Sequence, residues 1–272
     1  MPTRSWLAPA IGLSAVALAV GTSTAAFAAA PQHTAAHVHA RGDIMHHSTG
    51  AHHLTPVSSA HRHGKIVLHD TSDNWAGYAA TGGTYTSVSS SWVQPAVSCG
   101  SEDTYSSFWV GLDGDGTSSV EQTGTEADCS GGSASYSSWY EMYPANPVNY
   151  SDNVAPGDSF TGTVTTDGSG DFTLTLTDNT EGWTETQNES GSSATGGSAE
   201  VIAEAPYSNG VLPLSDFGTA DFTGATVDGS ALGSSSPVQI NLVSDGGVTE
   251  ATTSGLDSSG EDFSVTWDST GS

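Results

Sequence analysis

The stretch Phe172-Thr173-Leu174-Thr175-Leu176-Thr177 alternates large apolar side chains with threonine at every step. Successive side chains of a β-strand point to opposite faces, so this alternation predicts a strand with one buried face and one wet face. Such half-buried strands are typical of antiparallel sheets that cover a core with one side. The stretch therefore predicts a β-sheet protein.

Residues typical of β-strands also recur on both sides of this stretch. Short runs rich in Val, Thr, Tyr, Phe and Trp are separated by clusters of Gly, Ser, Asp and Asn, and no segment has a sustained helical period. We therefore expect a single all-β domain, built as a sandwich or a barrel. The expected strands are Val88–Val93, Ser107–Leu112, Ser118–Thr123, Ala134–Tyr143, Asp158–Thr165, Phe172–Thr177, Gly182–Gln187, Ala199–Glu204, Val238–Val243 and Phe263–Trp267.

The N-terminus has the features of an export signal. Arg4 gives a positive start, the apolar run Leu13–Val20 is too short to span a bilayer, and Ala26-Phe27-Ala28 has the small-x-small pattern of a cleavage site. We interpret residues 1–30 as a signal peptide. The protein is therefore expected to be secreted and extracellular.

Residues 31–70 differ in composition from everything that follows. They contain all ten histidines together with Arg41, Arg62 and Lys65, and they have no Phe, Trp or Tyr with which to build a core. We interpret them as a basic pro-segment that binds the mature domain, residues 71–272. A plain linker and a His-rich metal-binding tract are the alternatives.

The mature region is strongly acidic. From Thr71 to Ser272 there is no Lys, Arg or His, whereas only Asp43 and Asp70 of the 30 acidic residues precede it. Nucleic acids and anionic membranes require positive contacts, so both are excluded as partners. Crowded carboxylates have raised pKa values in the folded state, which stabilises the fold in acid and weakens it as pH rises. The mature domain is therefore expected to work in acid.

The two cysteines, Cys99 and Cys129, both lie in this acidic region. In an exported chain the expected state is one disulfide bond. A thiol nucleophile is excluded, because the mature region has no histidine to activate it.

Most hydrolytic mechanisms are excluded on the same ground. A Ser-His-Asp triad lacks its base, a zinc site lacks imidazole ligands, and no phosphate-binding or dinucleotide-binding loop is present. The Asp-Thr/Ser-Gly triplets of aspartic peptidases are absent as well. A glutamate that activates water, with an amide side chain as donor to the oxyanion, remains possible in acid. We expect neither a metal nor a cofactor.

Five strings, in order, resemble the glutamic peptidase (eqolisin) family. They are Asp73-Asn74-Trp75-Ala76-Gly77-Tyr78, Trp109-Val110-Gly111-Leu112-Asp113-Gly114, Gln122-Thr123-Gly124, Trp139-Tyr140-Glu141-Met142-Tyr143-Pro144 and Ala199-Glu200-Val201-Ile202-Ala203-Glu204. Met142 departs from the pattern, because a Trp is common there in the family.

The resemblance implies a concanavalin A-like (lectin-like) jelly roll, an antiparallel β-sandwich with Gln122 and Glu204 as the catalytic pair. Glu204 would take a proton from the attacking water and later give it to the leaving amine, while Gln122 stabilises the tetrahedral intermediate. The implied substrates are proteins and peptides, the pro-segment is a second partner, and we expect a monomer. The residues implied to bind substrate or to hold the catalytic groups are Trp75, Trp109, Asp113, Trp139, Glu141 and Tyr143.

Other interpretations stay open at this point. A carbohydrate- or surface-binding β-sandwich would leave Gln122 and Glu204 dispensable. A glycosidase would pair Glu204 with another acid such as Glu200. Trp109 and Trp139 could be plain core, and Asp113 could serve to form a turn.

Overall fold

The structure, a computed structural model, describes residues 60–62, 65–191 and 194–271, all of which belong to the second of the chain's two units, residues 42–272. The expected signal peptide, residues 1–30, and most of the expected pro-segment lie outside the described residues. Within the described ranges, no helix has the length and apolar character needed to cross a membrane.

Strands account for nearly all of the regular structure in the described residues, so the all-β prediction is confirmed. The elements are β1 (Ala60–Arg62), β2 (Lys65–Ser72), β3 (Trp75–Thr81), β4 (Ser87–Val93), β5 (Ser107–Leu112), β6 (Val120–Ser130), β7 (Ser133–Tyr143), β8 (Val148–Asn149), β9 (Ser159–Thr166), β10 (Asp171–Asp178), β11 (Trp183–Ser190), β12 (Ser198–Glu204), β13 (Thr219–Val227), β14 (Ser230–Ala231), the 3₁₀ helix η1 (Leu232–Ser235), β15 (Val238–Val243), β16 (Thr249–Thr253) and β17 (Phe263–Trp267).

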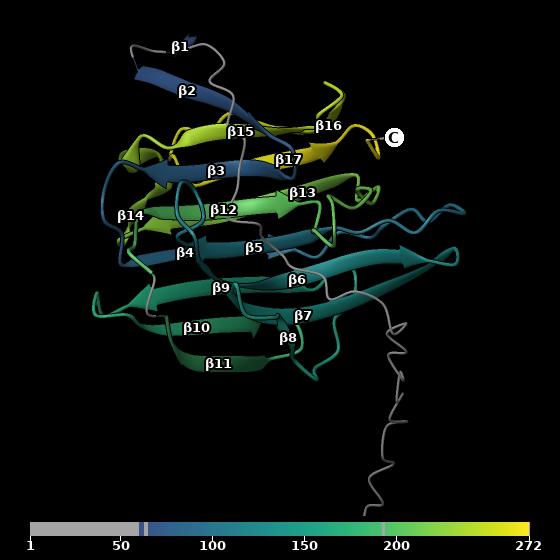
Figure 1. Cartoon of the computed structure of the whole chain (residues 1–272), viewed down its shortest axis with the longest axis horizontal. Helices are drawn as coiled ribbons and strands as arrows, with labels where there is room; N and C mark the ends of the chain where they lie inside the picture. Colours follow the sequence, from purple (N-terminus) through teal and green to yellow (C-terminus); the bar gives the residue numbers. More distant parts are fainter. Residues whose placement is uncertain (1–59, 63–64, 192–193, 272) are drawn as a thin grey trace, which may run out of the picture. The chain divides into compact units, whose positions relative to one another are not determined.

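The strands form one hydrogen-bonded network that folds into two layers, viewed in Figure 1 with one layer in front of the other. Sheet A has the order β7-β6-β5-β12-β3-β15-β2. Sheet B has the order β11-β10-β9-β4-β13-β17-β16. Strand β15 also pairs with β16 and so joins the layers. The antiparallel β-sandwich is confirmed, with one parallel pairing between its named strands, that of β15 with β2.

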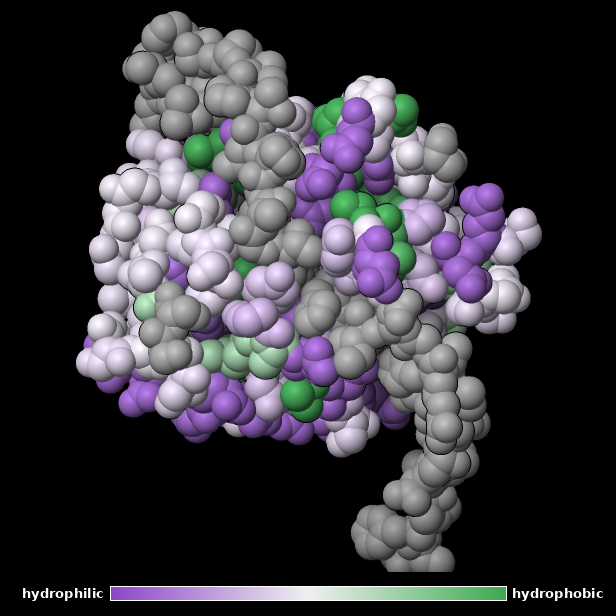
Figure 2. Space-filling view, viewed as in Figure 1, coloured by the Kyte–Doolittle hydropathy of each residue, from purple (hydrophilic) through white to green (hydrophobic). Residues whose placement is uncertain are grey.

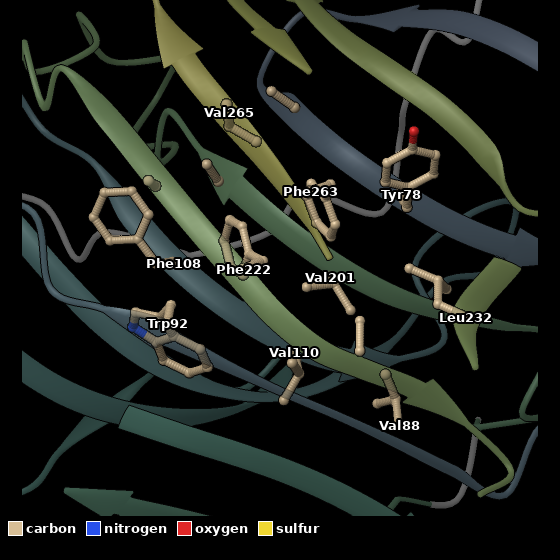
Figure 3. Close-up of a cluster of buried hydrophobic side chains, with 14 of the residues drawn as sticks. Tyr78, Val88, Trp92, Phe108, Val110, Val201, Phe222, Leu232, Phe263 and Val265 are labelled. Atoms are coloured by element: carbon tan, nitrogen blue, oxygen red, sulfur yellow. The ribbon is translucent and has the colours of Figure 1, made fainter. Parts of the chain in front are cut away.

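The main core lies between the two sheets. Figure 3 shows Phe108, Val110 and Val201 of sheet A near Trp92 and Phe222 of sheet B. These side chains are buried, and stacking sheets through such interdigitated side chains is what stabilises a sandwich.

A second apolar cluster lies on the other face of sheet A. It consists of Trp75, Ala79, Trp109, Val120, Trp139, Ile202 and Ile240. Strands β5 and β12 are therefore buried on both faces. The outer face of sheet B carries serines and threonines instead. On the face of the molecule drawn in Figure 2, the coloured surface is mostly hydrophilic and apolar residues are scattered.

Every strand expected from the sequence is present, and three have the expected bounds: Ser107–Leu112, Val238–Val243 and Phe263–Trp267. The expectation for Ser118–Thr123 was too short and began too early. The Thr117 side chain bonds Gly114 N and Ser119 O in a turn, and the strand then runs from Val120 to Ser130 because it pairs with β7 along its whole length.

Two further features bear on the N-terminal half of the fold. The predicted disulfide between Cys99 and Cys129 is present. Strand β2 runs from Lys65 to Ser72, so the expected boundary between residues 70 and 71 falls inside a strand.

Candidate active site

Cross-strand register gathers most of the sequence-predicted site residues on one face of sheet A. Glu204 pairs with Trp75 of β3 and with Ser107 of β5, and Gln122 pairs with Glu141 of β7. Directly paired residues, and residues two apart in a strand, share a face. The intervening side chains, such as Val201, point into the core between the sheets (Figure 3). The site face is therefore turned away from sheet B.

The Glu204 carboxyl is fully buried and held by two N–H donors. Asn74 Nδ2 donates to Oε1 at 2.9 Å, and Trp109 Nε1 donates to Oε2 at 2.6 Å. Burial raises the pKa of Glu204 well above its usual range, the Trp109 bond partly offsets this, and the charge of Glu141 raises the pKa further. Glu204 therefore holds its proton more strongly than an ordinary glutamate.

Gln122 has a fixed orientation. Its Nε2 donates to Glu141 Oε2 at 2.9 Å, and the side chain is fully buried. Its Oε1 has no hydrogen-bond partner among the described residues. Because the carboxylate of Glu141 accepts only, it selects the NH₂ end of the amide and leaves the second N–H and the oxygen for other groups.

The glycine of Gln122-Thr123-Gly124 makes room for the tryptophan beside it. Gly124 pairs with Trp109, and a Cβ at Gly124 would lie 2.6 Å from the Trp109 Cβ. Any side chain there would displace Trp109, whose indole holds Glu204. This explains physically why the Gln-Thr-Gly string and the Trp-Val-Gly string occur together.

The four predicted aromatic residues lie on the same face. Trp75 and Trp109 meet edge to face with centroids 5.0 Å apart, and both are fully buried, as is Trp139. Tyr143 is partly buried against the same cluster. Trp109 and Trp139 thus serve as packing groups, and Trp109 also holds the carboxyl of Glu204.

Asp113 is placed differently from the other predicted residues. It has a positive φ of 64°, which fits the turn interpretation, and it is fully buried. Its carboxylate accepts bonds from Thr195 N, Thr195 Oγ1, Gly196 N and Gly197 N at 2.9–3.0 Å. Asp113 therefore anchors the loop that precedes β12.

Sequence reasoning assigned no role to Asn74 or Glu126, and it named Glu200 only as the possible second acid of a glycosidase. Asn74 was part of a quoted string, but nothing in the sequence indicates that it contacts a residue 130 positions away. Glu126 and Glu200 lie fully buried on the site face, and burial raises the pKa of Glu126 to about 7 and that of Glu200 well above its usual range. The only available signal was their strand spacing from Gln122 and Glu204.

Known proteins share both the sequence and the fold. The model of the Peptidase A4 family matches residues 73–267. Aspergillopepsin-2 from Aspergillus niger is 32% identical over 213 residues, which is 68% of this chain and 75% of that protein. A crystal structure of scytalido-glutamic peptidase with a transition state analog inhibitor has a TM-score of 0.63 and 25% identity, covering 72% of this chain and 98% of that one.

The crystal structure of aspergilloglutamic peptidase from Aspergillus niger is also similar, with a TM-score of 0.54 and 31% identity over 61% of this chain and 99% of that one. The family model covers most of the described residues, and the solved relatives are matched over almost their whole length. This chain belongs to the Peptidase A4 family, the eqolisins, and is a glutamic-type endopeptidase.

Proposed function

We propose that Glu204 and Gln122 are the catalytic pair of this peptidase and that they cleave peptide bonds in acid. The observation that carries the proposal is the arrangement on the site face: a buried carboxyl held by two N–H donors, and a glutamine whose amide is oriented by Glu141. A general base and an oriented amide donor are what amide hydrolysis needs when no metal, histidine or lysine is used.

The proposed reaction has two steps and no covalent intermediate. Glu204 takes a proton from water while the water oxygen bonds to the scissile carbonyl carbon, and the free N–H of Gln122 donates to the developing oxyanion. Glu204 then gives the proton to the amide nitrogen, the C–N bond breaks, and the oxyanion collapses to a carboxylic acid. The enzyme returns to its starting protonation state.

Acid activity follows from the electrostatics of the site. Burial raises the pKa of Glu204, whereas the hydrogen bonds from Trp109 and Asn74 favour the ionised form and lower it, so the carboxyl can both accept and return a proton. From Thr71 onward the sequence has no Lys, Arg or His that would lower this pKa. Asparagine and tryptophan donors take the place of a cation.

The remaining predicted residues divide into two proposed roles. Trp75, Trp109, Trp139 and Tyr143 are proposed to line the substrate site near Glu204, where the three tryptophans are buried and Tyr143 is partly exposed. Glu141 orients Gln122. Asp113 holds the loop before β12 through its carboxylate and is proposed to act through that loop.

Secretion and the pro-segment complete the proposal. Residues 1–30 would direct export, and residues 31–70 would bind the acidic mature domain as a monomeric zymogen. Histidines gain charge below a pKa of about 6.5 and carboxylates lose theirs near about 4, so attraction should be strongest between these values and fade in stronger acid. If removal of residues 31–70 left activity at pH 5 unchanged, the proposal that this segment binds and inhibits the acidic domain would be contradicted.

The decisive experiment is digestion of a denatured protein from pH 2 to 8 by the wild type, Glu204→Gln and Gln122→Ala. We expect acid-limited cleavage in the wild type, a loss of about 10³-fold in Glu204→Gln, and a loss of about 10²–10³-fold in Gln122→Ala. Gln187→Ala, on edge strand β11, is the matched control and should be unaffected. Full activity in either site variant would remove that residue from the mechanism.

A further inference from the structure

The amide of Asn74 is one of the two N–H donors that hold Glu204. Asn74 lies between β2 and β3, is fully buried, and donates from Nδ2 to Glu204 Oε1 at 2.9 Å. An amide can point either its NH₂ or its C=O at a neighbour. If the amide were reversed, its carbonyl oxygen would face the carboxylate and repel it. What fixes the amide therefore matters for Glu204.

Ser72 fixes it. Ser72 Oγ accepts bonds from the backbone N–H of Asn74 at 3.3 Å and of Trp75 at 3.1 Å, and it donates to Asn74 Oδ1 at 3.2 Å. A hydroxyl has two acceptor positions and one proton. With both acceptor positions used by the backbone, the proton points at Asn74 Oδ1, and the NH₂ of Asn74 is left facing Glu204.

We propose that Ser72 and Asn74 are positioning residues for catalysis, which hold the Glu204 carboxyl in the orientation in which it accepts a proton from water. This rests on the proposed catalytic role of Glu204. Neither residue is required to touch the substrate. Both act through hydrogen bonds to the group that does.

The hydrogen bonds from Ser72 to Asn74 and from Asn74 to Glu204, called the relay below, also connect the site to the segment where maturation is expected. Ser72 is the last residue of β2 and pairs with Leu242 of β15, in the parallel ladder that begins at Leu68. The expected boundary between residues 70 and 71 lies just before it. Maturation must therefore leave Ser72 in the chain, because a cut after Ser72 would release the orientation of Asn74.

A pH profile detects the relay, because its donors favour the ionised form of Glu204. Glu141 on β7 is the carboxyl group whose charge acts on Glu204, and the other carboxyl groups of the site face include Glu126 and Asp128 on β6 and Glu200 on β12; all stay unchanged in the variants below. Removing the Asn74 donor weakens the ionised form, so the pKa of Glu204 rises. Activity that depends on ionised Glu204 then appears only at higher pH.

The test is kcat and KM against pH for the full chain after maturation, with a peptide substrate. Asn74→Ala should lower kcat about tenfold or more on the acid side, leave KM nearly unchanged, and move the acid limb to higher pH. Ser72→Ala should also move the acid limb of the activity profile to higher pH, by a smaller shift than Asn74→Ala. Ser72→Thr keeps the hydroxyl group and should show the wild-type acid limb. Ser90→Ala, a buried serine of sheet B, is the control.

The outcomes separate the two proposals. If Glu204→Gln is inactive but Asn74→Ala and Ser72→Ala keep the wild-type acid limb, the relay is wrong. If Glu204→Gln is active, the catalytic assignment itself fails. Should Asn74→Ala not fold, as judged by its thermal midpoint, the comparison of Ser72→Ala with Ser72→Thr decides alone, and equal profiles for those two variants would overturn the relay.

Discussion

The two outward faces of the sandwich are built from opposite chemistry. Sheet B turns a lattice of hydroxyl groups outward, with rows such as Ser89, Thr163, Thr175 and Thr186 across four strands. Neighbouring hydroxyls bond each other, for example Ser89 with Thr163 at 2.8 Å. The site face of sheet A instead holds tryptophans and carboxyl groups that are buried. One face is built mainly from hydroxyl groups, with a few exposed carboxylates such as Asp171 and Asp221, and the other buries its carboxyl groups.

The difference shows where pH acts on this molecule. Hydroxyl groups keep the same charge at every pH of interest, so the outer face of sheet B stays hydrated when the surface carboxylates are protonated. The buried carboxyls of the site face gain charge as pH rises, and from Thr71 onward no Lys, Arg or His can compensate them. Loss of activity and of stability toward neutral pH should therefore both begin at sheet A.

The largest effect is expected from removing the central indole of the site face. Trp109→Ala should lower the free energy of unfolding by about 3–5 kcal/mol, because it leaves a cavity beside Trp75, and it should abolish activity by freeing Glu204. Trp109→Phe keeps most of the packing but lacks the N–H. It should cost much less stability, measured by urea unfolding, and still move the acid limb of the activity profile to higher pH. A wild-type limb in Trp109→Phe would contradict the role of the indole N–H.

A smaller effect is expected from neutralising one buried acid of the site face. Burial raises the pKa of Glu126 to about 7, so the group stabilises the fold fully below its unfolded pKa of about 4.5, and this contribution is lost as pH rises toward 7. Glu126→Gln imitates the protonated form. Compared with the wild type, it should reduce the fall in unfolding free energy between these pH values by about 2–3 kcal/mol.

The measurement is chemical unfolding at several pH values between 4 and 8. Glu181→Gln, an exposed glutamate in the turn before β11, is the control and should keep the wild-type pH dependence. Equal slopes for Glu126→Gln and the wild type would show that the pH dependence comes from elsewhere, for instance from Asp115, whose burial raises its pKa to about 6.

The same contrast explains which parts of the fold could be predicted from the sequence. Strand β10 was recognisable because its outward face is wet, so apolar and polar residues alternate. Strand β3, Trp75-Ala76-Gly77-Tyr78-Ala79-Ala80-Thr81, was missed because it is buried on both faces and packs small residues closely, which leaves no alternation. Strand β12 is equally buried, and it was expected as the run Ala199–Glu204, in which Glu200 and Glu204 alternate with Val201 and Ala203.

The candidate site was predictable to a similar degree. The resemblance supplied Gln122 and Glu204, and alternation along β12 put Glu200 and Glu204 on one face. The partners that set their behaviour were not predictable, since Asn74 meets Glu204 only through the pairing of β3 with β12. Asp113 was expected beside the substrate. Its bonds to residues 195–197 depend on where two loops meet, which no local pattern encodes.

The smallest effect is expected on the hydroxyl face of sheet B. Thr175 Oγ1 lies 3.3 Å from Thr186 Oγ1 across two strands, and both side chains are accessible to water. Thr175→Val keeps the β-branched shape and loses a hydrogen bond that water can replace, so unfolding free energy should change by about 0.5 kcal/mol or less. Because no titratable group is touched, its activity profile and the pH dependence of its stability should overlay those of the wild type. A shifted profile would mean that the two faces are coupled through the core, and that sheet B also takes part in the pH response.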